Sequence, residues 1–461
     1  MIDWNAIGDE ATQLLSGYLK IKSLNPPGDE RETAEFLTTH LRQRGLEPQI
    51  YTSSPNRVNL VARLPGDGSK KPILLFHHMD IVEADPQRWS CDPFGGEISD
   101  GYVWGRGAID MKGMGIMQLL ALDLLQRHNP NRTRDIIFLA AADEEKGGAY
   151  GTQWLIENHW PEIEAEYVWD EGSFGLQDFF GPTPVFTVAV AEKKALWLKL
   201  VAHGEPGHSG MPHDDNAANI LLRALERVLA LNSKYELNPV TKMMFQKIGS
   251  IMSFPKSFLL KNLHNPIIFR LMQSALTSDP TIAAMLKDTL SITVLRAGGK
   301  ENIIPDRAEA TLDIRLLPDR NPEAFLENLK KLIADERVEI EIIQSPEQAA
   351  ISEVSTEFYK TLSGVLKGLV SESITAPMLT PGTTDSCFFR RKGVNSYGLF
   401  PAILNPGELA RFHGIDERIS IENLRLGTQI TYEVLRKLSN ITAQCSKNSL
   451  PCHPEGALFS D

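Results

Sequence analysis

Over the first 190 residues, short apolar runs alternate with segments of helical periodicity. Runs of strand length occur at 57–64, 72–76, 135–142 and 166–169, and helical periodicity occurs at 4–22, 30–44, 111–128 and 149–158. Continuous apolar strands followed by helices are typical of a parallel sheet that is buried on both faces. The pattern therefore predicts an α/β domain, with a mainly parallel sheet covered by helices.

The pattern changes after about residue 190. Segments 195–203, 308–316 and 338–343 alternate like half-buried antiparallel strands, and a helix-rich stretch at about 214–290 lies among them. Helical periodicity returns at 355–369 and 421–438, with a strand near 395–400. We predict a first domain segment at 1–191, an inserted α+β domain at 192–345, and a return to the first domain at 346–461 with a polar C-terminal tail.

Three of the predicted strands run directly into polar side chains. His78 and Asp80 follow the second run, Glu144 and Glu145 follow the third, and Asp170 follows the fourth. Ligand sites of α/β sheets form beyond the carboxyl ends of the strands. A histidine nitrogen can bind a metal while a nearby carboxylate accepts its other ring N–H. Taken alone, His78 and Asp80 also fit a hydrogen-bonded surface pair.

Each of the remaining polar motifs also fits a role that does not involve a metal ion. Glu144 and Glu145 fit a solvated acidic turn, or a pair in which one carboxylate binds metal and the other takes a proton. Asp110 ends a glycine-containing loop whose spacing matches neither phosphate-binding pattern, so it is a helix cap or a metal bridge. Together with His413 downstream, two imidazoles and three carboxylates suit paired zinc ions.

Composition narrows the choice of function. The 461 residues carry a formal net charge of −12 and a pI near 5.5, which disfavours nucleic acid as a partner. No apolar run reaches the length of a membrane span and the N-terminus lacks a signal-peptide pattern, so we expect a cytoplasmic protein without a membrane partner. Four scattered cysteines form no disulfide framework. Cys445, Cys452 and His453 fit a loosely ordered tail better than a metal or disulfide site.

Five motifs in order carry a resemblance to a known family. They are His78-x-Asp80, Gly105-Arg106-Gly107-x-x-Asp110-x-Lys112-Gly113, Asp143-Glu144-Glu145-x-Gly147-Gly148, Asp170-Glu171-Gly172 and His413-Gly414-x-Asp416-Glu417. From about residue 10 to 438 the chain resembles the di-zinc exopeptidases and deacylases, which include acetylornithine deacetylase, succinyl-diaminopimelate desuccinylase, aminoacylase and glutamate carboxypeptidase. Its inserted domain, with Asn265-Pro266 and 295–302, is most similar to the carboxypeptidase S and N-acyl-amino-acid hydrolase branch.

The resemblance implies a role for each motif residue. His78, Asp110 and Asp170 would hold one zinc ion of each subunit, and Asp110, Glu145 and His413 the other, with Co²⁺ or Mn²⁺ as substitutes. Glu144 would be the general base and later proton donor, and Asp80 would orient His78. The family often has a cis peptide bond after the bridging aspartate, here Asp110–Met111.

The inserted domain resembles the family's lid and dimerisation domain, which implies a homodimer. His208 would stabilise the tetrahedral intermediate, often in the partner's site, and Asn302 and Arg315 would contact substrate. Gly382 resembles the glycine loop near the substrate carboxylate, although Thr383 stands where the family often has a second glycine. The apolar stretch 243–285 is predicted to be lid core, with an acyl-chain groove as the alternative.

The function implied is zinc-dependent hydrolysis of an amide bond by a metal-activated bridging water. The substrate would be a short peptide with a free carboxylate or an N-acyl amino acid. One alternative is a deacylase of a single biosynthetic N-acyl intermediate. The others are a non-catalytic relative that binds amino-acid derivatives or a partner protein, and a metal-free α/β binding module.

Overall fold

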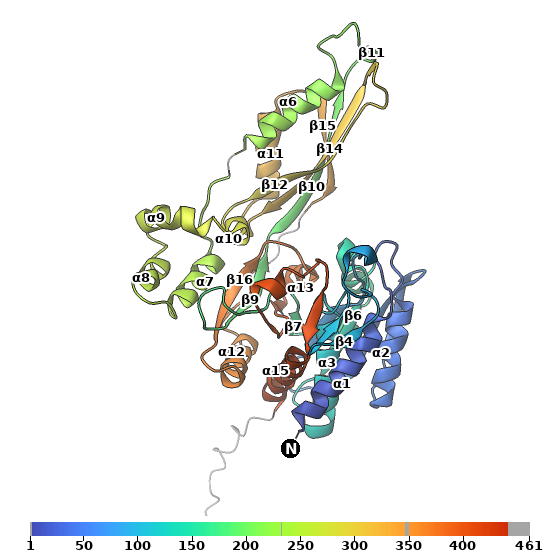
Figure 1. The fold of residues 1–461 in the computed structure, drawn as a ribbon, viewed down its shortest axis with the longest axis vertical. Helices are drawn as coiled ribbons and strands as arrows, with labels where there is room; N and C mark the ends of the chain where they lie inside the picture. The colour runs from blue at the N-terminus through green and yellow to red at the C-terminus, as the bar shows by residue number, and fades with distance from the viewer. Residues whose placement is uncertain (1, 232, 346–349, 441–461) are drawn as a thin grey trace, which may run out of the picture.

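The computed structural model describes residues 2–231, 233–345 and 350–440, so Cys445, Cys452 and His453 lie outside the described residues. Figure 1 shows two bodies: a main domain around a large sheet, and a lid domain of four long strands with two helices beside them. Within the described ranges, no helix combines the length and the apolar character that crossing a membrane requires.

The large sheet has ten strands, and a parallel group lies at its centre. Its order is β1-β2-β6-β3-β7-β17-β9-β8-β18, with β16 paired to β9. Strand β3 runs parallel to both β6 and β7, β7 is parallel to β17, and antiparallel pairs flank this group, β2 with β6 on one side and β17 with β9 on the other. The predicted mainly parallel sheet is therefore confirmed. The strands are β1 (Gln49–Ser54), β2 (Arg57–Leu64), β3 (Ile73–His78), β6 (Ile136–Ala141), β7 (Tyr167–Asp170), β8 (Gly175–Leu176), β9 (Val185–Glu192), β16 (Ile374–Thr380), β17 (Asn395–Gly398) and β18 (Ile403–Leu404).

Helices cover this sheet, and one of them is buried along most of its length. The helices are α1 (Trp4–Leu19), α2 (Arg31–Gln43), α3 (Lys112–His128), α4 (Thr152–Asn158), α5 (Trp160–Ile163), α12 (Glu357–Leu369), α13 (Ser386–Arg391), α14 (Pro406–Leu409) and α15 (Ile421–Ser439). Every residue of α3 from 112 to 125 is buried, because α1 and α15 pack against it in addition to strands β3 and β6. A small sheet, β4 (Glu97–Ser99), β5 (Tyr102–Trp104) and β19 (Arg418–Ser420), lies at the edge of this layer.

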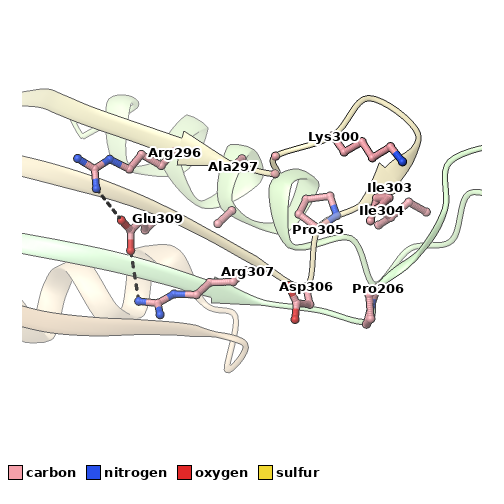
Figure 2. A pocket seen from close by; sticks show the side chains of 13 residues that line it. Pro206, Arg296, Ala297, Lys300, Ile303, Ile304, Pro305, Asp306, Arg307 and Glu309 are labelled. Carbon is pink, nitrogen blue, oxygen red and sulfur yellow. Dashed lines mark hydrogen bonds and ion pairs between the residues drawn. The ribbon is translucent and has the colours of Figure 1, made fainter.

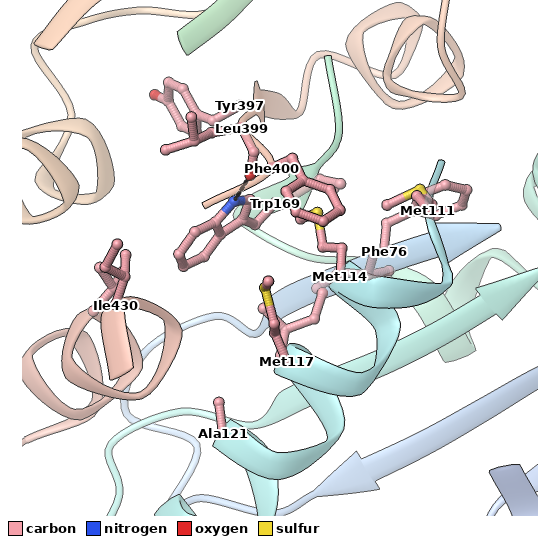
Figure 3. Packing of buried hydrophobic residues seen from close by; sticks show 14 of the residues in the cluster. Phe76, Met111, Met114, Met117, Ala121, Trp169, Tyr397, Leu399, Phe400 and Ile430 are labelled. Atoms are coloured by element: carbon pink, nitrogen blue, oxygen red, sulfur yellow. Dashed lines mark hydrogen bonds between the residues drawn. The ribbon is translucent and has the colours of Figure 1, made fainter. Parts of the chain in front are cut away.

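The main core lies between α3, α15 and the sheet. Figure 3 shows Trp169 of β7 among Met114 and Met117 of α3 and Ile430 of α15. Its indole N–H donates to the carbonyl of Leu399 at 2.8 Å, so this buried polar group is satisfied. Each large apolar side chain buried in this way contributes about 1.5–3 kcal/mol of transfer free energy. The dense packing fixes the strand ends that precede the polar motifs.

The lid domain is an antiparallel sheet of β12 (Thr289–Ala297), β14 (Arg307–Leu316), β10 (Lys194–His203) and β15 (Val338–Gln344). Helices α6 (Ala217–Leu229) and α11 (Pro322–Ile333) pack on one face of it. Burial alternates along β14, which confirms the predicted half-buried strands. At the far end of the lid, β11 (Gly207–His208) pairs with β13 (Ile303–Ile304).

Four helices connect α6 to β12: α7 (Pro239–Gly249), α8 (Lys256–Lys261), α9 (Pro266–Leu276) and α10 (Pro280–Met285). Buried side chains of α7, including Met244 and Phe245, belong to the apolar cluster of the main domain, because α7 packs against β16. The lid has its own separate cluster around β10, β14, α6 and α11. The prediction that 243–285 forms the lid core is therefore wrong for these buried residues.

Candidate metal centre

Two groups of potential metal ligands meet at the carboxyl end of the parallel strands. His78, Asp110 and Glu171 form one group, here called the inner triad, and all three are buried. Asp110, Glu145 and His413 form the outer triad, which is progressively more open to solvent. Within each triad, one ligand atom per residue lies within 4.8 Å of the others. Asp110 belongs to both triads, so its two carboxylate oxygens are placed to bridge a pair of ions.

The inner triad is set by two strand ends and the start of α3. His78 is the last residue of β3, and its Nε2 lies 3.0 Å from Asp110 Oδ1 and 3.4 Å from Glu171 Oε1. Glu171 is the first residue after β7. Asp110 immediately precedes the cis peptide bond Asp110–Met111, as the family resemblance implied. The buried core of the main domain therefore fixes the backbone of all three residues of the inner triad.

The outer triad comes from loops. His413 Nε2 lies 2.5 Å from Asp110 Oδ2 and 3.7 Å from Glu145 Oε2. The His413 side chain is 48% exposed, and its backbone adopts a left-handed φ of 54° that is uncommon for residues other than glycine. Glu145 belongs to a 3₁₀ turn, Glu144–Lys146, just beyond β6. The outer side of the site is therefore held by turn geometry instead of strand ends.

Asp170 was the expected inner ligand, and the structure places Glu171 there instead. Asp170 Oδ2 accepts hydrogen bonds from the Ser386 backbone N–H at 3.0 Å and the Ser386 hydroxyl at 2.7 Å. The Thr384 hydroxyl donates to the same oxygen at 3.2 Å, and Oδ1 accepts from the Glu171 N–H at 2.7 Å. The carboxylate of Asp170 therefore joins β7 to the loop before α13, and the next residue reaches His78.

Asp80 connects the two triads through its backbone and its side chain. Its carbonyl accepts from His78 Nδ1 at 2.9 Å, whereas its carboxylate Oδ1 is 3.6 Å from that nitrogen. The carboxylate instead accepts the backbone N–H groups of Glu144 and Glu145, each at 3.2 Å. Asn25 also donates to it at 2.8 Å. Asp80 thus orients His78 mainly through its carbonyl and holds the turn that carries the two glutamates.

Sequence reasoning gave no role to a buried pair, Arg106 and Glu417, that fixes both the bridging residue and His413. Glu417 accepts from Arg106 at 2.5 Å, and from the backbone N–H groups of Ile109 at 2.7 Å and Asp110 at 3.2 Å. Arg106 donates to the carbonyl of His413 at 3.3 Å. Both residues belong to the motifs quoted above, and this membership was the only sign in the sequence that they have a role. Their pairing joins residues more than 300 positions apart, so it becomes visible only in the folded structure.

The charge balance of the site tests whether these residues fit metal ions. The pKa of Glu145 and of Glu171 is raised to about 8, mainly by burial and next by the charge on Asp110. The pKa of His413 is raised mainly by its hydrogen bond to Asp110. Glu145 Oε1 is buried and has no hydrogen-bond partner among the described residues. Crowded carboxylates, a buried oxygen without a partner and two imidazoles fit divalent cations, which would supply the missing positive charge.

Glu144 lies beside the triads without belonging to either. Burial raises its pKa well above the usual carboxyl range, and the nearby Glu171 and Asp385 charges act in the same direction, while His78 opposes them. A carboxylate near reacting groups with a pKa shifted toward neutrality can both accept and return a proton. Glu144 is therefore a candidate for the proton transfer that the family resemblance implied.

A cavity of about 850 Å³ is lined by part of the lid and by every residue of the two triads except the fully buried His78. Asp110, Glu144, Glu145, Glu171 and His413 line it on the main-domain side, and Lys193, Trp197 and Arg315 on the lid side. Arg315 Nη1 donates to the Thr383 hydroxyl at 3.2 Å, next to Gly382, which also lines the cavity. The structure therefore brings Arg315 and Gly382 to the site.

His208 and Asn302 lie elsewhere. Both belong to the far end of the lid, where the Ser209 N–H donates to the Asn302 carbonyl at 3.2 Å, and the His208 side chain is exposed. A second cavity of about 590 Å³ lies there, and its Glu309 pairs with Arg307 at 3.2 Å and Arg296 at 3.7 Å (Figure 2). Within one chain, these two predicted substrate-contacting residues are not part of the metal centre.

Comparison with known proteins decides the family. The sequence pattern of peptidase family M20/M25/M40 matches residues 74–437. The chain belongs to this family. It is therefore a hydrolase of amide bonds in a metal-dependent family. The earlier resemblance to di-zinc exopeptidases and deacylases is confirmed at this level.

Several relatives match over most of the chain. N-fatty-acyl-amino acid synthase/hydrolase PM20D1 of Xenopus tropicalis is 30% identical over 93% of this chain and 85% of its own length. Probable carboxypeptidase S-like 2 of Dictyostelium discoideum is 32% identical, covering 80% and 72%. Aminoacylase-1 of Sus scrofa is 29% identical, covering 94% and 97%. The predicted branch is therefore confirmed.

The fold also matches solved structures. The M20 family metallo-carboxypeptidase Sso-CP2 from Sulfolobus solfataricus superposes with a TM-score of 0.72 at 22% identity, covering 93% of this chain and 99% of that one. The dipeptidase Dug1p from Saccharomyces cerevisiae gives a TM-score of 0.67 at 16% identity, covering 94% and 97%. At these identities the likeness supports the architecture of a main domain with an inserted lid.

Proposed function

We propose that the protein is a di-zinc hydrolase of N-acyl amino acids whose acyl group is apolar. The observation that carries the proposal is the cavity lined by Glu144, Arg315 and the open side of both metal-ligand triads. His78, Asp110 and Glu171 would hold one ion, and Asp110, Glu145 and His413 the other. When bound, paired divalent ions acidify water and polarise an amide carbonyl.

The residues of the chain supply proton transfer and orientation. Glu144 takes the proton of the attacking water and returns it to the nitrogen of the leaving amine, so a proton is neither gained nor lost over the cycle. Asp80 keeps Glu144 and Glu145 in place through their backbone N–H groups. Glu417 and Arg106 hold the backbone of Asp110 and of His413 in place through the Asp110 N–H and the His413 carbonyl.

The lining of the cavity supports the choice of substrate. Arg315 is a cation whose guanidinium reaches the Thr383 hydroxyl, so it suits a substrate carboxylate. Apolar surface comes from Phe174, Phe388, Phe412 and Trp197, which suit an acyl chain. The names of the relatives, a fatty-acyl-amino acid hydrolase and an aminoacylase, support the same class.

His208 and Asn302 are proposed to act in the active site of a partner subunit. Their position at the far end of the lid leaves them outside the cavity of their own chain. A homodimer through the lid would let each chain supply these residues to the other. Mixing inactive Glu144→Gln chains with inactive His208→Ala chains should restore about one quarter of wild-type activity. Half of the dimers would be mixed, and each would contain one complete site. Failure to regain activity after verified exchange of subunits would contradict the arrangement.

An activity screen tests the substrate class. The purified protein, with Zn²⁺, Co²⁺ or Mn²⁺ added in turn, is assayed on N-acyl amino acids of increasing acyl length and on dipeptides. We expect kcat/KM to rise with apolar acyl length. A preference for strictly polar substrates would contradict the proposal.

A matched pair of substrates tests whether Arg315 binds the substrate carboxylate. Arg315→Ala should raise KM for an N-acyl amino acid with a free carboxylate and leave the KM of its carboxamide counterpart nearly unchanged. An equal rise in both would show that Arg315 shapes the cavity without binding the carboxylate.

A further inference from the structure

Helices α8 and α9 present apolar side chains to solvent at one edge of the molecule. Phe254 and Ile267 are 82% and 79% exposed, and Leu271 and Phe258 are 71% and 54% exposed. In Figure 1 the two helices form the left-hand edge, next to the lid and away from the sheets. We call these four side chains the edge patch. Apolar side chains this open usually mark a contact surface.

Helical spacing places part of the edge patch on one face of α9. Ile267 and Leu271 are four residues apart in α9, and the exposed Arg270 and Ser274 lie one turn from them on the same face. Phe258 lies in α8 with the exposed Lys261 three residues after it, and Phe254 lies two residues before that helix begins. Buried side chains of the same region, Leu263 and Leu276, face the main core, so the apolar residues divide between two opposite sides.

The charge of this region is opposite to that of the chain. Between Glu236 and Asp279 there is no aspartate or glutamate, whereas Lys242, Lys247, Lys256, Lys261 and Arg270 are all present and exposed. The chain as a whole carries −12. Within the part of the chain that the structure describes, none of these five cations pairs with a carboxylate. Their positive charge is available to an external partner.

We propose that the edge patch docks this enzyme onto an anionic lipid surface. Exposed Phe, Leu and Ile beside lysine and arginine, with no acid between them, are the features of helices that lie in a membrane interface. Exposed apolar side chains can insert into a fluid lipid layer, whereas a protein partner would need a complementary pocket to receive them. The sequence predicted no membrane partner because no segment can span a bilayer, but peripheral docking requires only a few apolar side chains and a basic margin.

The helical segment that carries the edge patch is joined to the cavity of the metal centre. Lys193 lines that cavity, and its Nζ donates to the carbonyl of Lys287 at 2.9 Å, just after α10. The helical segment is thereby fastened to the wall of the cavity. The docking proposal itself stands on the edge patch and its charges and does not depend on the substrate class.

Vesicle sedimentation tests the proposal with the full-length protein. Vesicles contain either phosphatidylcholine alone or phosphatidylcholine with one quarter phosphatidylglycerol, at low salt. We expect the protein to sediment with the anionic vesicles and to be released when NaCl is raised, because the Debye length shortens from about 10 Å at 0.1 M to about 3 Å at 1 M. Equal sedimentation with neutral vesicles, or none with either, would overturn it.

Two sets of variants locate the surface. Ile267→Gln with Leu271→Gln should lower anionic-vesicle binding about 10-fold or more, and Lys256→Glu, Lys261→Glu and Arg270→Glu together should do the same. Matched controls are Leu222→Gln with Leu229→Gln on α6, which are also exposed, and Lys331→Glu, Lys360→Glu and Lys367→Glu elsewhere on the surface. The controls should keep binding, and all variants should keep their Tm and their amide hydrolysis.

Two further outcomes would overturn the proposal. Controls that lose binding as strongly as the edge-patch variants would show a general effect of charge or polarity. A solution mass that halves on substitution of Ile267 and Leu271 would show that a second copy of the chain covers the patch.

Discussion

The two halves of the metal centre are built differently although they share Asp110. In the inner triad, His78 is fully buried and stands at the end of β3, and Glu171 directly follows β7. In the outer triad, the His413 side chain is 48% exposed and the residue sits in a loop at positive φ. The sheet fixes the backbone of ligands on strand ends, whereas the backbone of ligands on turns depends on hydrogen bonds such as those of Asp80, Arg106 and Glu417. The inner half should therefore bind its ion more tightly and exchange it more slowly.

The largest expected effect belongs to the residue between the halves. Glu144→Gln should lower kcat about 10²- to 10⁴-fold, because the amide cannot take up and return the proton. Metal content, measured by mass spectrometry of the purified protein, should remain that of the wild type. The exposed Glu157→Gln on α4 is the control and should keep full activity. If the Glu144→Gln variant kept most of its activity, Glu144 would not be the general base.

Substitution of the two histidines compares the halves directly. His78→Ala should abolish most metal binding and destabilise the fold by about 3 kcal/mol, because it removes the imidazole that faces the buried Glu171 and Asp110 Oδ1. His413→Ala should lose the outer ion while Tm changes little, since that side chain is half exposed. Metal stoichiometry after dialysis and thermal unfolding measure both effects. Equal losses of metal and of Tm would show that the halves do not differ.

Glu171 and Asp170 are neighbours with different assignments. Glu171→Gln should weaken binding of the inner ion by at least about 100-fold, since even loss of an outer-shell partner costs 10- to 100-fold. Asp170→Asn should leave metal content nearly unchanged and act through the Thr384 to Ser386 loop, most visibly as a higher KM. Metal titration by calorimetry separates the two. If Asp170→Asn lost the inner ion and Glu171→Gln kept it, Asp170 would be the metal ligand.

The smallest effect is the pH dependence of the metal-free protein. Because burial raises the pKa of Glu145 and Glu171 to about 8, their protonated forms are favoured in the folded state. Their stabilisation is complete below the ordinary carboxyl pKa and is lost as pH rises toward 8. In EDTA, Tm should therefore fall by a few degrees between about pH 5 and pH 8. Zinc should reverse the trend, because metal binding requires the deprotonated carboxylates.

The control for this slope is the Glu145→Gln/Glu171→Gln double variant, which lacks both titrating carboxyls. Its Tm in EDTA should vary less between pH 5 and pH 8 than that of the wild type. If both proteins show the same slope, the titration lies outside the metal centre.

Much of the main domain could be predicted from the sequence. Strands with apolar residues at successive positions and buried helices have a strong local sequence pattern. The bounds of β2 and α3 were therefore predicted within a residue or two. The lid strands β10 and β14 were predicted from their alternation of apolar and polar residues. Short strands such as β8 and β18 were not, because two residues carry no periodicity.

The helical segment between α6 and β12 shows a second limit. Its apolar residues predicted burial in the lid, but the buried ones on α7, such as Met244 and Phe245, pack against β16 of the main domain. Helical periodicity tells which residues share a face and not which neighbour that face meets. The exposed face of α8 and α9, with its basic margin, was missed for the same reason.

By itself the sequence determined the α/β architecture, the inserted lid and the chemistry available at the strand ends, because these depend on local periodicity and on motif order. Only the tertiary structure decided which side chains converge. It turned Asp170 toward Ser386 and Glu171 toward His78, joined Arg106 to Glu417, and placed His208 far from its own metal centre. Each of these outcomes depends on contacts between residues that are distant along the chain, and a single sequence carries no record of such contacts.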